Sequence, residues 1–356
     1  MLVENVGGGQ SDVRSYLSFG LCRECSTIWN VGIFYSAMGI SIRVITGHNS
    51  LSHPKYLAHS MDLDKLRAKQ FLVVGLAKNC SKSIKTDITK VQSALKAFKH
   101  VQWLVIESDS RDRTVKKLGE LEREIENFRF ISLGALRKDF PLRTVRIAHC
   151  RNRYLDELSG NPIYAHIDYV IVADLDGVND QLTEQALLSC WARDDWDVCT
   201  ANQRGPYYDV WALRHKTWSP NDCWSQYKFL TKHGLSTNES LFAAIHSRMI
   251  KIDENLEWIE VDSSFGGLAI YRRKALEGTQ YVGLDDEGEM VCEHVQFHAT
   301  LKSKGGRIFI NPKLINTGYT PHTRKLLLWS RVKRWIKGLW NIVITNPIKA
   351  LINMTV

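Results

Sequence analysis

Apolar runs of strand length alternate with segments of helical periodicity from residue 71 onward. The runs are rich in Val, Ile, Leu and Phe, and the segments between them carry apolar residues at helical spacing. We predict strands over 71–77, 101–107, 128–134 and 166–173, and helices over 83–99, 111–127 and 143–159. Continuous apolar strands separated by helices indicate a mostly parallel sheet covered on both faces. The pattern therefore predicts a Rossmann-like α/β fold with a mostly parallel sheet flanked by helices.

The later half of the chain is less regular. A glycine turn leading into a strand is predicted at Val261–Arg273, and a helix closed by glycines at Val291–Gly306. Near the start, Ile28–Ile42 is apolar but short for a membrane span of about 20 residues, so we expect a packed helix or strand. The expected parts are an N-terminal extension over 1–66, a catalytic domain over 67–323 and a tail over 324–356.

Two carboxylates follow the predicted strand 166–173. Asp174 and Asp176 lie on the same side of an extended segment, with Leu175 turned away. Two carboxylates that face together repel each other, and burying them is costly unless a cation compensates. Divalent cations take oxygen ligands and bridge phosphates. Because ligands bind at the carboxyl ends of strands in such sheets, the pair is a candidate metal and phosphate site.

Several proteins use such a pair, and the pair alone does not separate them. A nucleotide-sugar glycosyltransferase holds metal and diphosphate with it, and a haloacid-dehalogenase-like phosphohydrolase uses an apolar strand followed by DxDG as its nucleophile motif. A non-catalytic sugar or membrane binder is a third interpretation. In the phosphohydrolase the nucleophile strand opens the fold, whereas here several βα units precede it. The acidic segment Leu284–Glu289 is similar to the later metal-binding motif of the phosphohydrolase, so this alternative stays open.

Polar residues also follow the first two predicted strands, where a sugar nucleotide would bind. We expect Ala77 and Asn79, at the end of the first strand, to contact the nucleotide sugar, and Asp109 and Asp112, after the second, to contact its ribose or base. Ser110 or Asp112 could equally cap the following helix.

Arginines on the predicted helix 143–159 are candidates for binding diphosphate, because the guanidinium fork reaches two oxygens. Arg146 and Arg151 share a face of that helix only loosely. Arg151, with Asn152 beside it, is the better functional candidate. The alternative is surface ion pairing with Asp156 or Glu157.

Five segments in order resemble a known family. They are "RIAHCRNRYL", "VIVADLDG", "YYDVWALR", "SFGGLAIYRR" and "CEHVQFH". Together they resemble GT-A glycosyltransferases, most closely the capsule-associated α-1,3-mannosyltransferases of glycosyltransferase family 69 and their bacterial relatives. The resemblance covers about Phe71 to His322.

The resemblance implies a GT-A fold and a metal-dependent transferase that uses Mn²⁺ or Mg²⁺ and a GDP- or UDP-hexose. Asp174 and Asp176 would hold the metal and the diphosphate, with Asp176 the more direct ligand. His322 is similar in placement to a third ligand, although it could be an ordinary loop histidine. Gly266 and Gly267 would lie near the donor sugar and the acceptor.

The same resemblance implies a role for the helix that begins near residue 293. Glu293 could act as general base in an inverting reaction. The family-69 resemblance implies a retaining reaction, so we favour a role for Glu293 in positioning the acceptor or the donor.

His294 and His298, on the same helix, are expected to pack or bond locally. The aromatic stretch Tyr207–Trp224 is either a sugar-binding wall or core.

The net charge of +9 is concentrated in the tail. Seven Lys or Arg and no acidic residue lie between Arg324 and Val356, which leaves +2 for the rest of the chain. Basicity confined to a tail argues against a nucleic-acid-binding face. An apolar, Trp-rich stripe with basic flanks indicates an interfacial helix over 326–345 on an anionic membrane, or a helix packed on the domain.

The cysteines and the N-terminal residues indicate where in the cell we expect the protein. Cysteines in the α/β segments are expected to be buried free thiols, which favours a reducing compartment. The first residues lack the pattern of a cleavable signal peptide. We expect a cytoplasmic protein, with the tail as a route to the inner face of the membrane.

Overall fold

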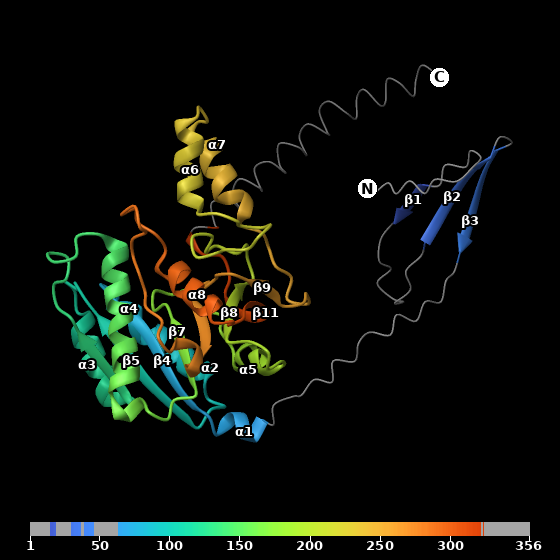
Figure 1. Ribbon diagram of the computed structural model, residues 1–356. Helices are drawn as coiled ribbons and strands as arrows, with labels where there is room; N and C mark the ends of the chain where they lie inside the picture. The colour runs from blue at the N-terminus through green and yellow to red at the C-terminus, as the bar shows by residue number, and fades with distance from the viewer. Residues whose placement is uncertain (1–14, 19–29, 37–38, 46–62, 322, 324–356) are drawn as a thin grey trace, which may run out of the picture. The chain divides into compact units, whose positions relative to one another are not determined.

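The computed structural model describes residues 15–18, 30–36, 39–45, 63–321 and 323 of the 356-residue chain. The chain divides into two compact units, Met1–Leu57 and Ala58–Val356 (Figure 1). The first contains an antiparallel sheet of β1 (Ser15–Ser18), β2 (Asn30–Ser36) and β3 (Gly39–Ile45). The described part of the apolar stretch 28–42 is therefore in strands.

The second unit is built on an eight-stranded sheet in the order β6-β5-β4-β7-β10-β8-β11-β9. The strands are β4 (Gln70–Ala77), β5 (His100–Glu107), β6 (Phe128–Ser132), β7 (Tyr169–Ala173), β8 (Val198–Gln203), β9 (Ile259–Val261), β10 (Leu268–Arg272) and β11 (Ile308–Thr317). Strands β6, β5, β4 and β7 are parallel neighbours, and β8 pairs in parallel with β11. Strand β10 runs antiparallel between β7 and β8, and β9 runs antiparallel to β11. The predicted mostly parallel sheet is confirmed.

Helices cover both faces of this sheet. The helices of this unit are α1 (Leu63–Arg67), α2 (Ile84–Ala94), α3 (Thr114–Glu124), α4 (Arg143–Gly160), α5 (Glu184–Leu188), α6 (Cys223–Lys232), α7 (Thr237–Ala244) and α8 (Glu293–Ser303). Of these, α6 and α7 pack against each other in a small separate core. Alternate residues of β4 enter different cores: Phe71 and Val73 pack with α2, α3 and α5, whereas Leu72 and Val74 pack with α4 and α8. Burial on both faces explains the uninterrupted apolar strands.

The apolar pattern overestimates the length of some helices. The predicted helix 83–99 ends at Ala94, yet Leu95 and Phe98 stay buried in the core beyond it. Apolar spacing reports burial, and burial continues after the helix has ended. Cys150, Cys190, Cys199 and Cys292 are buried free thiols, as predicted, and Cys80 is half-buried. None of the helices in the described ranges is long and apolar enough to span a bilayer.

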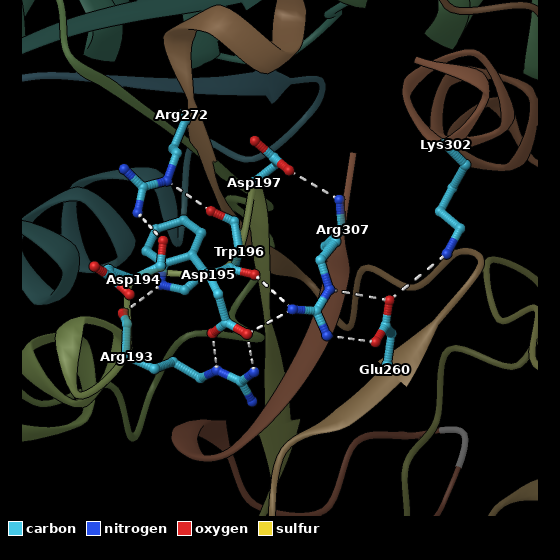
Figure 2. A network of polar contacts seen from close by, with 9 residues as sticks. All are labelled: Arg193, Asp194, Asp195, Trp196, Asp197, Glu260, Arg272, Lys302 and Arg307. Carbon is cyan, nitrogen blue, oxygen red and sulfur yellow. Dashed lines mark hydrogen bonds and ion pairs between the residues drawn. The ribbon is translucent and has the colours of Figure 1, made fainter. Parts of the chain in front are cut away.

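Ion pairs tie together the sheet edge at the amino ends of β8 and β11 (Figure 2). The Arg307 guanidinium donates to Glu260 at 2.7 Å and to Asp195 at 2.5 Å. The Arg307 backbone N–H donates to Asp197 at 2.9 Å. Arg272 donates to the Trp196 carbonyl at 2.6 Å. One guanidinium thus joins the loop before β8 to β9. A network of this kind stabilises the fold more than an isolated surface ion pair does.

Replacing Arg307→Met should lower the free energy of unfolding by about 1 kcal/mol, because a partly exposed multi-partner network is lost. Chemical denaturation measures this loss, which should shrink in about 1 M salt because screening weakens exposed charges. Arg67→Met is the matched control, since the ion pair of Arg67 in the described part of the chain, with the exposed Asp64 at 3.6 Å, is a surface pair. Equal effects of the two substitutions would contradict the role given to Arg307.

Candidate functional site

A cavity of about 430 Å³ lies at the carboxyl ends of β4, β5 and β7. The predicted site residues that line it are Ala77 at the end of β4, Asp109 after β5, Arg146 and Arg151 on α4, Asp174 and Asp176 after β7, and Glu293 at the start of α8. Other lining residues are Lys78, Ser108, Tyr208, Asp209, Trp211, Phe265 and His294. The cavity therefore lies at the edge of the sheet where the fold class predicts ligand binding.

The buried guanidinium of Arg151 stands between two carboxylates. Its side chain is 6% exposed, and it donates to Glu293 at 2.9 Å and lies 3.5 Å from Asp174. The guanidinium also lies over the rings of Phe265 and Tyr281, at 5.2 and 5.6 Å from their centroids. Burial alone would lower the pKa of Arg151, but the surrounding acidic groups, Glu293 foremost, raise it overall. Arg151 is therefore a fixed cation that compensates carboxylates from two other elements.

Asp174 has an environment that opposes its charge. The side chain is 35% exposed to the cavity, and protein encloses the rest. Burial raises the pKa of Asp174 to about 7, and the nearby carboxylates of Asp176 and Asp209 act in the same direction, while Arg151 opposes them. Asp176 is exposed and lines the same cavity. A site that disfavours its own negative charge is suited to receive a cation.

Two glycines support the strand end that carries Asp174. The Asp174 N–H donates to the Gly267 carbonyl at 2.9 Å, and the Gly266 N–H donates to Asp209 at 3.0 Å. Both glycines have positive φ, and a Cβ on Gly267 would lie 2.7 Å from the Tyr208 hydroxyl. Burial raises the pKa of Asp209, although the Gly266 amide counteracts this. Gly266 and Gly267 thus lie directly behind the cavity.

Buried amides lock this turn in place, and the sequence pattern does not reveal them. Asn179 donates to the carbonyls of Asp174 and Gly267, at 2.8 and 3.2 Å. Asn316 donates to Asn179 at 3.0 Å and to the Gly266 carbonyl at 2.8 Å. Asn316 lies near the end of β11, directly after the apolar Leu314 and Ile315, and it is fully buried.

Asp109, which follows β5, is held in the cavity lining by basic groups. Its carboxylate lies 3.4 Å from Arg146 and 3.8 Å from Lys78, and it accepts the Arg137 N–H at 2.9 Å. Arg146 also donates to the carbonyls of Phe140 and Pro141. The two basic side chains and the carboxylate form a charged part of the cavity lining.

Five predicted residues do not line the cavity: Gly266 and Gly267, which support it from behind, and Asn79, Asp112 and Asn152. Asn79 accepts the Arg111 N–H at 2.8 Å, and Asn152 exchanges two hydrogen bonds with the backbone of Tyr281. Asp112 accepts from Thr114 and from the Ser81 N–H, and these hydrogen bonds hold the pKa of its carboxyl well below the usual range. Asp112 therefore makes the helix-capping contacts that were the alternative to nucleotide binding.

The two histidines of α8 differ. His298 bonds Ser263 and Tyr271 through its two ring nitrogens, both at 2.9 Å, so it is bonded locally as predicted. His294 stacks on Phe265 at 4.1 Å and lines the cavity, and neither of its nitrogens has a hydrogen-bond partner among the described residues. Burial lowers the pKa of His294 well below its usual value, which leaves a neutral ring facing the cavity.

The predicted third metal ligand, His322, and the predicted tail 324–356 lie outside the described residues. Within the described ranges, no three His, Cys, Asp or Glu side chains come together closely enough to hold a metal. A metal at Asp174 and Asp176 would need further ligands from a bound molecule or from a residue outside those ranges.

The fold is an α/β domain with a mostly parallel sheet, and its cavity lies at the carboxyl ends of parallel strands. No family model and no curated protein matches the sequence. Among solved structures, the chain is similar to S. aureus TarS, with 15% identity and a TM-score of 0.39 over 68% of this chain and 57% of that one.

Two further solved structures are similar at the same level. One is the mannosyltransferase PcManGT from Pyrobaculum calidifontis, in complex with GDP-Man and Mn²⁺, with 14% identity and a TM-score of 0.40 over 70% of this chain and 56% of that one. The other is glucosyl-3-phosphoglycerate synthase from Mycobacterium tuberculosis, in complex with UDP, with 14% identity and a TM-score of 0.35 over 72% of each chain. The chain thus spans little more than half of the first two structures.

Removing the Arg151 cation should destabilise the folded protein. Arg151→Met leaves the carboxylates of Asp174 and Glu293 without their buried partner, which we expect to lower the free energy of unfolding by about 3–5 kcal/mol. Arg153→Met on the same helix is the control, because Arg153 is exposed and pairs with Glu157. That control should cost less than about 1 kcal/mol in the same denaturant titration. Similar losses for both variants would contradict the compensating role of Arg151.

The raised pKa of Asp174 predicts a pH-dependent stability of the metal-free protein. In the unfolded chain this carboxyl has a pKa of about 3.9. Between that value and about 7 the folded state holds a proton that the unfolded state has lost, so stability falls as pH rises through this window. Asp174→Asn removes the effect.

Thermal unfolding in EDTA tests this expectation. The melting temperature of Asp174→Asn relative to the natural protein should rise between about pH 5 and about pH 8. A difference that stays constant with pH would show that Asp174 ionises normally.

Proposed function

We propose that this protein is a metal-dependent glycosyltransferase that moves a hexose from a nucleotide sugar to a hydroxyl of a glycan or lipid-linked acceptor. The observation that supports this most is the cavity at the carboxyl ends of the parallel strands. It combines the carboxylates of Asp174 and Asp176 with the basic side chains of Lys78, Arg146 and Arg151. Such a mixture suits a ligand that carries both a metal-bound diphosphate and polar sugar groups.

The residues fit Mn²⁺ or Mg²⁺. Burial and neighbouring carboxylates disfavour the charge of Asp174, which a divalent cation would offset. Asp174 and Asp176 would hold the ion, and His322 is the proposed third protein ligand. Two carboxylates plus substrate phosphates are the usual way in which proteins bind Mg²⁺. The metal would neutralise charge on the departing nucleoside diphosphate.

The part of the cavity lined by Asp109 would bind the nucleoside. Asp109 is held by Arg146 and Lys78, with one carboxylate oxygen that has no hydrogen-bond partner within the described structure. A buried acceptor of that kind suits a ribose hydroxyl or a base N–H. Ala77, at the end of β4, would bring its backbone to the same ligand. Asn79, Asp112 and Asn152 would act on the ligand only through the loops that they brace.

The acceptor side is assigned to the start of α8. Glu293 is held by Arg151 at 2.9 Å, so its carboxylate has a fixed direction. We assign Glu293 to positioning a sugar hydroxyl, in line with the retention that the family-69 resemblance implies. That resemblance also favours mannose as the hexose and surface polysaccharide synthesis as the setting. Membrane contact through 326–345, from a cytoplasmic location, belongs to the same proposal.

The proposal predicts metal-dependent release of nucleoside diphosphate from a nucleotide sugar. The protein is incubated with Mn²⁺ and a panel of GDP- and UDP-hexoses, and release of GDP or UDP is measured. Asp176→Asn should lower the rate by about 100-fold or more, because it weakens the electrostatic stabilisation of the leaving group. Asp180→Asn should have little effect, since Asp180 lies on the same loop but bonds Thr317.

Two outcomes would contradict the proposal. The first is that no nucleotide sugar and no nucleoside diphosphate binds in the presence of Mn²⁺. The second is hydrolysis of p-nitrophenyl phosphate that depends on Asp174 while Asp176→Asn leaves nucleotide sugars unaffected, which is the behaviour of a phosphohydrolase.

A further inference from the structure

Three residues that line the cavity, Asp109, Trp211 and His294, carry buried polar atoms without a hydrogen-bond partner in the described part of the chain. His294 differs from the other two, because both of its ring nitrogens are in this state and its side chain is 2% exposed. A buried polar group without a partner destabilises a folded protein. Such a side chain in the lining of a cavity indicates that a ligand completes its hydrogen bonds.

His298, one helical turn further along α8, shows how this fold treats an imidazole that serves the structure. Its two ring nitrogens bond the hydroxyls of Ser263 and Tyr271, both at 2.9 Å. His294 is held by a ring face instead, since it stacks on Phe265 with the ring centroids 4.1 Å apart. Aromatic packing therefore fixes the His294 ring and leaves its nitrogens available to a ligand.

The charges beside His294 select the kind of group that would bond the ring. The Glu293 carboxylate lies 3.7 Å from Nε2 of His294, too far for a hydrogen bond, and accepts from Arg151 at 2.9 Å. Burial and the Arg151 charge keep the pKa of His294 well below its usual value, so the neutral ring has one donor and one acceptor nitrogen. An anionic group would meet the Glu293 carboxylate, and a cationic group the Arg151 guanidinium. A hydroxyl is neutral, donates and accepts, and so matches the ring.

We propose that His294 is a sugar-binding residue whose ring nitrogens bond hydroxyl groups of a hexose held beside Glu293. This inference rests on the proposed function and deepens it. Arg151 bonds Glu293 and lies 3.5 Å from Asp174, so one guanidinium separates the carboxylate beside His294 from the carboxylate assigned to metal and diphosphate. A hexose at that place is either the transferred sugar or a sugar of the acceptor, and both present the same hydroxyl chemistry.

The substitution His294→Phe separates a binding role from a structural one. Phenylalanine keeps the stack on Phe265 and removes the unpaired nitrogens, so the melting temperature should stay unchanged or rise. The affinity for the sugar, measured by calorimetry, should fall by about tenfold, the effect of losing about one hydrogen bond in a buried site. His294→Gln restores a donor and an acceptor and should recover part of the affinity.

His298→Phe is the matched control on the same helix. It removes the partner of the Ser263 and Tyr271 hydroxyls, so it should lower the melting temperature. Below that temperature its affinity for the sugar should equal that of the natural protein.

Nitrogen-15 NMR of the histidine side chains of the full chain measures binding at the ring itself, because hydrogen bonding changes the signals of the ring nitrogens. The His294 signals are identified by their loss in His294→Gln. One arm adds Mn²⁺ with GDP- or UDP-hexoses, and the other adds methyl α-D-mannoside and methyl α-D-glucoside as models of an acceptor sugar. The signals should move in the arm whose hexose binds at His294 and stay in place with Mn²⁺ and GDP or UDP alone.

Two results would overturn the inference. One is that no sugar in either arm moves the His294 signals. The other is a His294→Phe variant that melts lower but binds the sugars as the natural protein does, because buried water would then complete the hydrogen bonds of the ring. Either result leaves the Asp176-dependent binding of GDP or UDP with Mn²⁺ intact, whereas failure of the proposed function abolishes that binding. The methyl hexosides carry no phosphate and test the ring even then.

Discussion

The ion pairs of Arg151 make the candidate site possible. Asp174, Asp209 and Glu293 gather around one cavity, and carboxylates so close together would repel each other and resist burial. The Arg151 guanidinium, itself buried from α4, compensates two of them. The same contacts join α4 to the end of β7 and to the start of α8. The same ion pairs therefore balance the charge of the site and hold these elements together.

Sheet topology determines where this charge lies. Because β10 runs antiparallel between β7 and β8, its entry turn at Gly266 and Gly267 lies behind the carboxyl end of β7. Asn179 and Asn316, from distant parts of the chain, fix that turn through buried hydrogen bonds. Buried amides whose hydrogen bonds are satisfied make a rigid support. Asp174 consequently projects from a backbone that is held from two sides.

Sequence periodicity predicts the parallel half of the sheet because burial on both faces leaves continuous apolar runs, as in β4 and β7. It also places Ala77, Asp109 and Asp174 correctly at one sheet edge, since each follows such a run. It predicts the strand β10 but not its antiparallel direction, because short apolar runs carry no strand direction. Nor does it separate Asp109, which faces the cavity, from Asp112, which caps a helix, since the same side chain serves both purposes. Asn316 acts across the whole fold, and its partners are invisible to local spacing.

The account rests on a cavity in which metal and diphosphate bind together, since the described residues offer two carboxylates but no complete metal site. Titration of Mn²⁺ followed by electron paramagnetic resonance, with and without GDP or UDP, tests this most directly. The account predicts weak binding of Mn²⁺ alone and much tighter binding once the nucleoside diphosphate is present, with the enhancement lost in Asp176→Asn. Nucleoside diphosphate that binds equally well without metal, or Mn²⁺ that binds equally well to Asp176→Asn, would contradict it.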